Sequence, residues 1–227
     1  MFPIYDDVPT KRIPIITIAI IIINTVVYIY QISLIDEYSA FVYYMGLIPY
    51  EISHNVEIIA NGPSLIYSAI FTSMFIHGSF IHLAGNMLFL WIFGNNVEDY
   101  VGRINFIIFY FICGIASALT QVLTDLNSTI PVIGASGAIA GILGAYLVLY
   151  PKAKVNTLII FGFFIRMIKI PAVVVLSFWI LYQFLYGISS LAERSGEGGT
   201  AWFAHIGGFI MGYLLIKIYN FAIHARG

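Results

Sequence analysis

Long apolar runs, separated by short polar segments, recur along the whole chain. A helix needs about 20 apolar residues to cross about 30 Å of hydrocarbon. We expect six helical runs, at residues 13–32, 76–95, 104–123, 136–150, 171–191 and 202–218. Charged residues make up only 9% of the chain, too few to cover a water-facing surface. The sequence therefore predicts an all-α polytopic membrane protein, a six-transmembrane-helix bundle folded as a single membrane-embedded domain over residues 1–227.

The distribution of positive charge predicts the orientation of these spans. Because loops rich in lysine and arginine stay in the cytoplasm, we expect both termini inside and the second, fourth and sixth helices running inward from the outer face. This arrangement leaves only Arg194 outside. The residues that it places inside are Lys11, Arg12, Arg103, Lys152, Lys154, Arg166, Lys169, Lys217 and Arg226.

Two apolar segments need a separate interpretation. The first run follows Lys11 and Arg12, as a signal peptide would, but no small-residue cleavage site follows it, so we expect a retained helix. Residues 155–168 are interrupted by Gly162 and are too short to cross a bilayer. We expect them to form an interfacial or re-entrant segment.

Polar side chains inside apolar runs are costly in lipid, so each is expected to have a partner or a function. Three groups stand out: His77, His82 and Asn86 near the start of the second run, Ser136 at the start of the fourth, and His205 at the start of the sixth. Because these three helices run inward, all the groups should lie toward the outer side at comparable depth. The fourth run is only about 22 Å long, so Ser136 should lie in a recess that admits water.

Ser136 fits either a helix N-cap or a nucleophile. The flanking glycines, Gly134 and Gly137, favour a nucleophile because they let a substrate carbonyl approach closely. The free N–H groups at a helix start also suit a developing oxyanion. His205 likewise fits either a buried histidine satisfied by a neighbour or a general base.

Glycines four residues apart form smooth strips on two of the expected helices. Gly137 and Gly141 lie on the fourth, and Gly208 and Gly212 on the sixth. Small-residue strips let helices pack closely in lipid. If the strips face one another, the Ser136 hydroxyl comes within reach of the imidazole, the arrangement of acyl-transfer enzymes. No buried carboxylate accompanies the pair, which predicts a dyad whose imidazole is oriented by packing.

On the second helix, His82 and Asn86 are four residues apart and share a face. They are candidate oxyanion donors beside the Ser136 N–H, with interhelical hydrogen bonds as the alternative role. His77 precedes His82 by five residues, which on a helix turns it about 140° away. We expect His77 to be structural and to tie the long first loop to the second helix.

These residues resemble the motifs of the rhomboid family of intramembrane serine proteases. Gly134-Ala135-Ser136-Gly137 matches its GxSG motif, residues 204–212 match its AHxxGxxxG motif, and the two histidines and the asparagine match its helix-two pattern. The resemblance implies a serine endopeptidase, a hydrolase that uses no cofactor or metal. It also implies a Ser136–His205 dyad, oxyanion donors at His82 and Asn86, and a mobile cap over residues 192–202.

Two positions depart from the family pattern. Ser68 and Ala69 stand where the family often has Trp-Arg, and Ala140 replaces an aromatic residue that often packs on the catalytic histidine. Loop anchoring and the orientation of His205 are the properties that these departures affect.

Other function classes fit the sequence less well. A transporter or channel would also use intramembrane histidines, but no inverted repeat or intramembrane acid is evident. A catalytically inactive rhomboid-like escort would not need both dyad residues. The net charge of −1 and the lack of a basic stripe argue against nucleic acid, and the single cysteine, Cys113, excludes an internal disulfide.

We expect transmembrane protein substrates and the lipid bilayer as partners. We expect the protein in the cell membrane, with an active site open to the extracytoplasmic side. The sequence does not indicate an oligomeric state.

Overall fold

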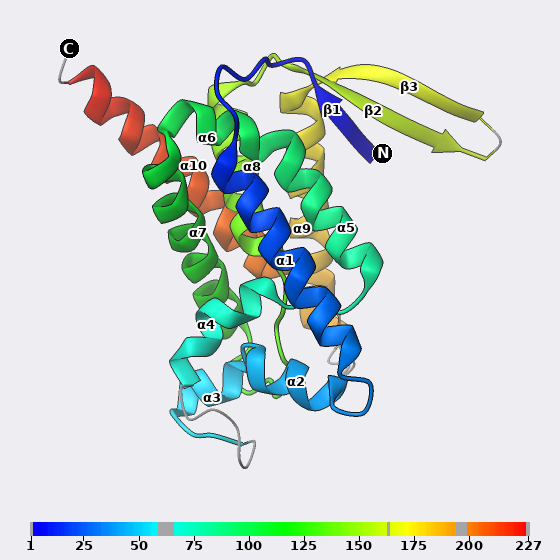
Figure 1. Ribbon diagram of the computed structural model, residues 1–227, viewed down its shortest axis with the longest axis vertical. Coiled ribbons are helices and arrows are strands. Elements are labelled where there is room, and N and C mark those ends of the chain that lie inside the picture. The colour runs from blue at the N-terminus through cyan, green and yellow to red at the C-terminus, as the bar shows by residue number, and fades with distance from the viewer. Residues whose placement is uncertain (1, 59–65, 163, 194–198, 226–227) are drawn as a thin grey trace.

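The computed structural model describes residues 2–58, 66–162, 164–193 and 199–225, and these are mostly helical (Figure 1). Two short 3₁₀ turns flank α4, and a π-helical turn, Leu90–Gly94, joins α5 to α6. The helices are α1 (Ile15–Ser33), α2 (Tyr38–Met45), α3 (Pro49–His54), α4 (Ala69–Thr72), α5 (Phe80–Phe89), α6 (Asn95–Val101), α7 (Arg103–Thr124), α8 (Ser136–Leu149), α9 (Ala172–Glu193) and α10 (Trp202–His224).

Four of the described helices, α1, α7, α9 and α10, are long and apolar enough to cross a membrane. The helical segments Ile66–Phe75 and Phe80–Val101 meet at an 80° bend. If the two segments together count as one span, the number of spans rises to five. The fourth predicted run forms α8, whose 14 residues extend about 21 Å, short of the hydrocarbon thickness. The chain is therefore a multi-pass membrane protein with four or five spans by length and composition, and the six-span topology stays a prediction.

The prediction of an all-α fold is wrong, because the described residues include a three-stranded antiparallel sheet in the order β1-β2-β3. Its strands are β1 (Phe2–Asp6), β2 (Lys154–Phe161) and β3 (Phe164–Pro171). The expected interfacial segment is thus a hairpin, and Gly162 takes a φ of 57° at its turn. β-Branched residues on both sides of this glycine favour strands over a helix.

α8 lies at the centre of the bundle, and its residues 137–146 are all buried. A helix that is apolar on every side is suited to such a position. α10 is its main neighbour, and the two backbones nearly touch at their glycines. A Cβ atom on Gly208 would lie 2.9 Å from the carbonyl carbon of Gly137, and one on Gly212 would lie 2.6 Å from Gly141 Cα. Gly141 also makes room for α7, since its Cβ would lie 2.5 Å from Cys113 Cβ.

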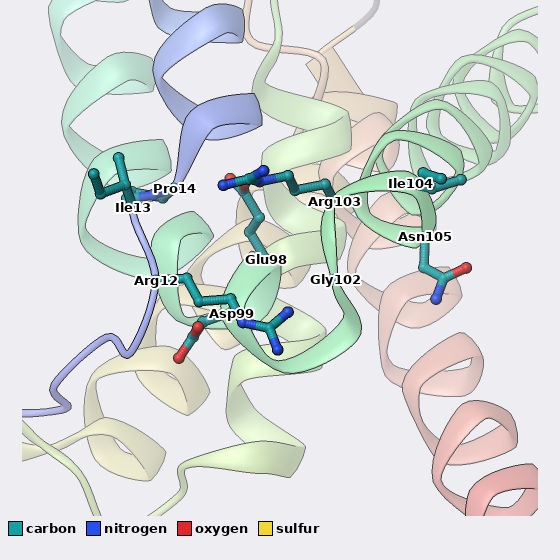
Figure 2. A pocket seen from close by; sticks show the side chains of 9 residues that line it. All are labelled: Arg12, Ile13, Pro14, Glu98, Asp99, Gly102, Arg103, Ile104 and Asn105. Atoms are coloured by element: carbon teal, nitrogen blue, oxygen red, sulfur yellow. The ribbon is translucent and has the colours of Figure 1, made fainter.

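Both ends of the chain lie at one end of the bundle (Figure 1), where Glu98 caps α1. The Glu98 carboxylate accepts hydrogen bonds from Ile16 N at 3.0 Å, and from Thr17 N and Oγ1 at 2.7 Å each. It borders an open pocket of about 590 Å³, which Arg12 and Arg103 also line (Figure 2). This pocket lies at the start of α7, roughly 27 Å along that helix from Gln121, which contacts α10 beside His205. It is therefore separate from the polar groups that the sequence singles out.

Candidate active site

Ser136 and His205 meet where α8 and α10 begin. Ser136 is the first residue of α8, and His205 lies in the first turn of α10. The distance from Ser136 Oγ to His205 Nε2 is 2.8 Å, which is hydrogen-bonding distance. His205 is only 9% exposed. Ser136 does not cap its helix: Ala135 occupies the N-cap position, and the serine hydroxyl is directed to the imidazole.

The other ring nitrogen of His205 is held from α9. His205 Nδ1 lies 2.7 Å from Oε1 of Gln183, a side chain that is 4% exposed. One turn earlier on α9, the Trp179 ring lies against the imidazole, with 5.7 Å between ring centroids and a 39° tilt. The expectation that packing alone orients the imidazole is therefore wrong. Sequence reasoning missed Gln183. Its position inside an otherwise apolar run could have indicated it, because such a polar group needs a partner in lipid.

The chain turns sharply just before α8. Gly134 has a φ of 121°, in the region that favours glycine, and its N–H donates to Ser73 O at 2.8 Å. A Cβ atom at this position would lie 2.8 Å from His82 Nε2, so the imidazole of His82 rests against the bare backbone. Val132 and Leu47 hydrogen-bond each other's backbones at 2.7 and 3.0 Å, which fixes the approach to this turn.

His77, His82 and Asn86 converge, although the sequence predicted that the His77 ring would point away. The helical-wheel argument does not apply to His77, because α5 begins only at Phe80, with Ser79 as its N-cap. His77 Nε2 lies 2.9 Å from Asn86 Nδ2, and the His77 and His82 rings meet edge to face with centroids 5.0 Å apart. The His77 backbone is tied instead to α1: its N–H and C=O both bond the Gln31 side chain, at 3.2 and 2.8 Å.

Three groups on α5 and α8 keep hydrogen-bonding capacity that no described residue uses. The N–H of Ser136 belongs to the first turn of α8, where N–H groups have no partner within the helix. Asn86 Nδ2 keeps a second hydrogen after bonding His77, and the described residues offer the His82 ring no hydrogen bond. A cavity of about 30 Å³ adjoins Ser136, large enough for about two water molecules.

The remaining expectations from the sequence concern the cap and a metal site. Residues 194–198 of the expected cap, 192–202, lie outside the described part of the chain. Within the described part, no group of three or more His, Cys, Asp or Glu side chains could hold a metal ion.

Comparison with known proteins points in one direction. The family model described as Rhomboid domain matches residues 66–220, well over half of the chain. The chain is 35% identical to Rhomboid protein 1, mitochondrial, of Saccharomyces cerevisiae over 150 residues, which is 64% of this chain and 40% of that protein. It is 27% identical over 225 residues to the rhomboid protease AarA of Providencia stuartii, covering 92% of this chain and 74% of AarA. The chain matches 40% of RHOMBOID-like protein 5 of Arabidopsis thaliana, at 30% identity, so it spans well under half of some relatives.

Proposed function

Because the chain belongs to the rhomboid family, we propose that it is a serine endopeptidase that cleaves peptide bonds in or near the transmembrane segments of other membrane proteins. Two relatives, AarA and GluP of Bacillus subtilis, are named as rhomboid proteases. The observation that carries the proposal is the 2.8 Å distance between Ser136 Oγ and His205 Nε2. A neutral imidazole nitrogen at this distance can take the hydroxyl proton.

The proposed reaction is acyl transfer in two steps. Ser136 Oγ attacks the scissile carbonyl carbon while its proton passes to His205 Nε2. The C–N bond then breaks as His205 returns this proton to the leaving amine. Water attacks the resulting ester with His205 again as base, which releases the acid and restores the serine. The oxyanion formed in each step would be stabilised by the Ser136 N–H and by the His82 and Asn86 side chains.

We infer the orientation in the membrane from the distribution of positive charge. Both termini lie at the end of the bundle that carries Glu98 (Figure 1). Arg12 and Arg103 line the pocket beside Glu98, the Lys11 N–H donates to Asp99, and the Lys154 N–H donates to Asp7, and these positive residues support a cytoplasmic location for that end. The dyad, at the opposite ends of α8 and α10, would then open toward the extracytoplasmic side of the cell membrane. We propose that the whole chain forms one membrane-embedded domain whose partners are lipid and transmembrane substrates.

The test is cleavage of a reconstituted transmembrane substrate together with labelling by a fluorophosphonate, which reacts with activated serines. Ser136→Ala and His205→Ala should each lower cleavage at least about 1,000-fold, and Ser136→Ala should abolish labelling. Ser33→Ala, at an exposed helical serine, and His224→Ala, at an exposed histidine, are matched controls and should behave like the parent. Cleavage by Ser136→Ala at the parent rate would disprove the mechanism. An unlabelled, inactive parent would favour an escort or a channel.

A further inference from the structure

Two side chains of α9, Gln183 and Trp179, contact the His205 ring. Gln183 Oε1 is 2.7 Å from Nδ1, on the side of the ring opposite Ser136, and Trp179 lies one helical turn earlier against the imidazole. Both ends of this hydrogen bond are buried. No carboxylate among the described residues is hydrogen-bonded to His205, so the amide is the polar group that meets Nδ1.

We propose that Gln183 is a positioning residue for catalysis, which fixes the tautomer and the orientation of His205. This inference rests on the proposed protease function. A neutral imidazole carries one N–H, and an amide oxygen can only accept a hydrogen bond. Gln183 Oε1 therefore places the proton on Nδ1 and leaves the lone pair of Nε2 for the Ser136 hydroxyl. The opposite tautomer would present an N–H to Ser136 and could not act as a base.

Trp179 completes this arrangement. Ala140 leaves α8 without a large side chain that could pack on the imidazole, whereas the indole on α9 limits rotation of the ring. A ring held by one tilted ring contact and one hydrogen bond at Nδ1 has a defined direction for Nε2. The site therefore orients its base from α9 rather than from the helix that bears the nucleophile.

A neutral acceptor also suits the surroundings. A buried carboxylate would be costly in lipid, and an amide avoids this cost. Unlike an aspartate, the amide cannot offset the positive charge that His205 gains when it takes the serine proton. This difference gives the proposal a signature that a purely structural role for Gln183 would not produce.

The experiment compares Gln183→Leu and Gln183→Glu with the parent. Gln183→Leu keeps the size but removes the acceptor, and we expect kcat to fall about 100- to 10,000-fold with KM near that of the parent. Thermal stability should fall because the buried Nδ1–H loses its partner, so rates are compared at a temperature at which both proteins are folded. Gln183→Glu keeps an acceptor and adds negative charge that stabilises the imidazolium. It should retain more activity than Gln183→Leu, and the acidic limb of its kcat/KM profile should move to higher pH. Leu181→Ala, at an exposed position on α9, is the control and should leave rate and profile unchanged.

The outcomes separate this proposal from the protease function. If the parent cleaves substrate and labels at Ser136 but Gln183→Leu keeps the parent rate, only the role of Gln183 is wrong. A Gln183→Leu enzyme that is impaired, beside a Gln183→Glu enzyme with an unshifted profile, would also overturn it in favour of a packing role. Failure of the parent to label at all would refute the protease function instead.

Discussion

The contact between α8 and α10 should control the distance between nucleophile and base. Gly137 directly follows Ser136, and Gly208 lies one turn after His205. A Cβ atom on Gly208 would overlap the carbonyl oxygen of Gly137 and lie 2.9 Å from its carbonyl carbon. Because both atoms belong to the backbone, no side chain can move aside, and Gly208→Ala must push the two helices apart.

The size of the effect follows from these distances. Ordinary van der Waals contact for a Cβ atom begins near 3.4 Å, so the carbonyl carbon alone requires the backbones to separate by several tenths of an ångström. The carbonyl oxygen is closer still, which brings the separation to about 1 Å. A displacement of about 1 Å can cost about 100-fold in rate, and overpacking of this kind costs about 1–3 kcal/mol of stability. The 2.8 Å contact between Ser136 and His205 would be lost at such a separation.

The assay is cleavage of a transmembrane substrate in liposomes, with thermal unfolding measured on the same preparations. Gly208→Ala should lower kcat about 100-fold in protein that still inserts. Gly85→Ala is the matched control, because a Cβ there meets nothing within 4 Å. Gly162, in the hairpin turn, is unsuitable as a control because its positive φ strains any side chain. Parental activity in Gly208→Ala would refute the view that this backbone contact sets the dyad distance.

Two further changes test other parts of the structure. Asn86→Ala should lower kcat about 10- to 1,000-fold through loss of an oxyanion donor, measured as above, and an unchanged kcat would remove Asn86 from the oxyanion site. Burial raises the pKa of Asp6, which accepts hydrogen bonds from Tyr146 and Asn96, above its ordinary 3.8. The folded state then binds this proton more tightly than the unfolded state, so stability should fall as pH rises from about 4 upward. Asp6→Asn should flatten this part of the melting-temperature profile, and an unchanged slope would contradict the assignment to Asp6.

The helices were predictable because bilayer thickness imposes a length on apolar runs. The run expected at 104–123 is α7, Arg103–Thr124, and the run expected at 136–150 is α8, Ser136–Leu149. Helices that run in the same direction also bring polar residues near their starts to one level. Ser136 and His205 are 69 residues apart in sequence, and their common depth together with the facing glycine strips predicted the contact between them.

The sheet was not predictable in the same way. The run at 155–168 is a short apolar run without a clear period, and such a run does not by itself distinguish a buried helix from a strand, although its β-branched residues favour a strand. Its partner strand lies at the other end of the chain, where Phe2 pairs with Leu158. Such a pairing depends on the tertiary position of β1, which Asp6 anchors through its bond to Asn96. No local pattern contains that information.

The predicted direction of the His77 side chain was also wrong. The angle predicted between His77 and His82 assumed one continuous helix, but the chain is extended at Ile76 and Ser79 and enters α5 only at Phe80. A break of a few residues in a span changes the direction of every side chain before it. The motif therefore contained the right residues but not the contact between His77 and Asn86.

The imidazole of His205 is subject to two constraints with different physical origins. Its distance from Ser136 depends on glycines that let the backbones of α8 and α10 touch, and glycine spacing is visible in a sequence. Its tautomer depends on α9, through the single hydrogen bond that Nδ1–H donates to Gln183 Oε1. α9 is less buried than α7 and packs less extensively on α8 than α10 does. Because the two constraints act through different helices, a movement of α9 would release Nδ1 and the ring orientation while the glycines still hold the backbones of α8 and α10 together, and activity would be lost although the two helices had not separated.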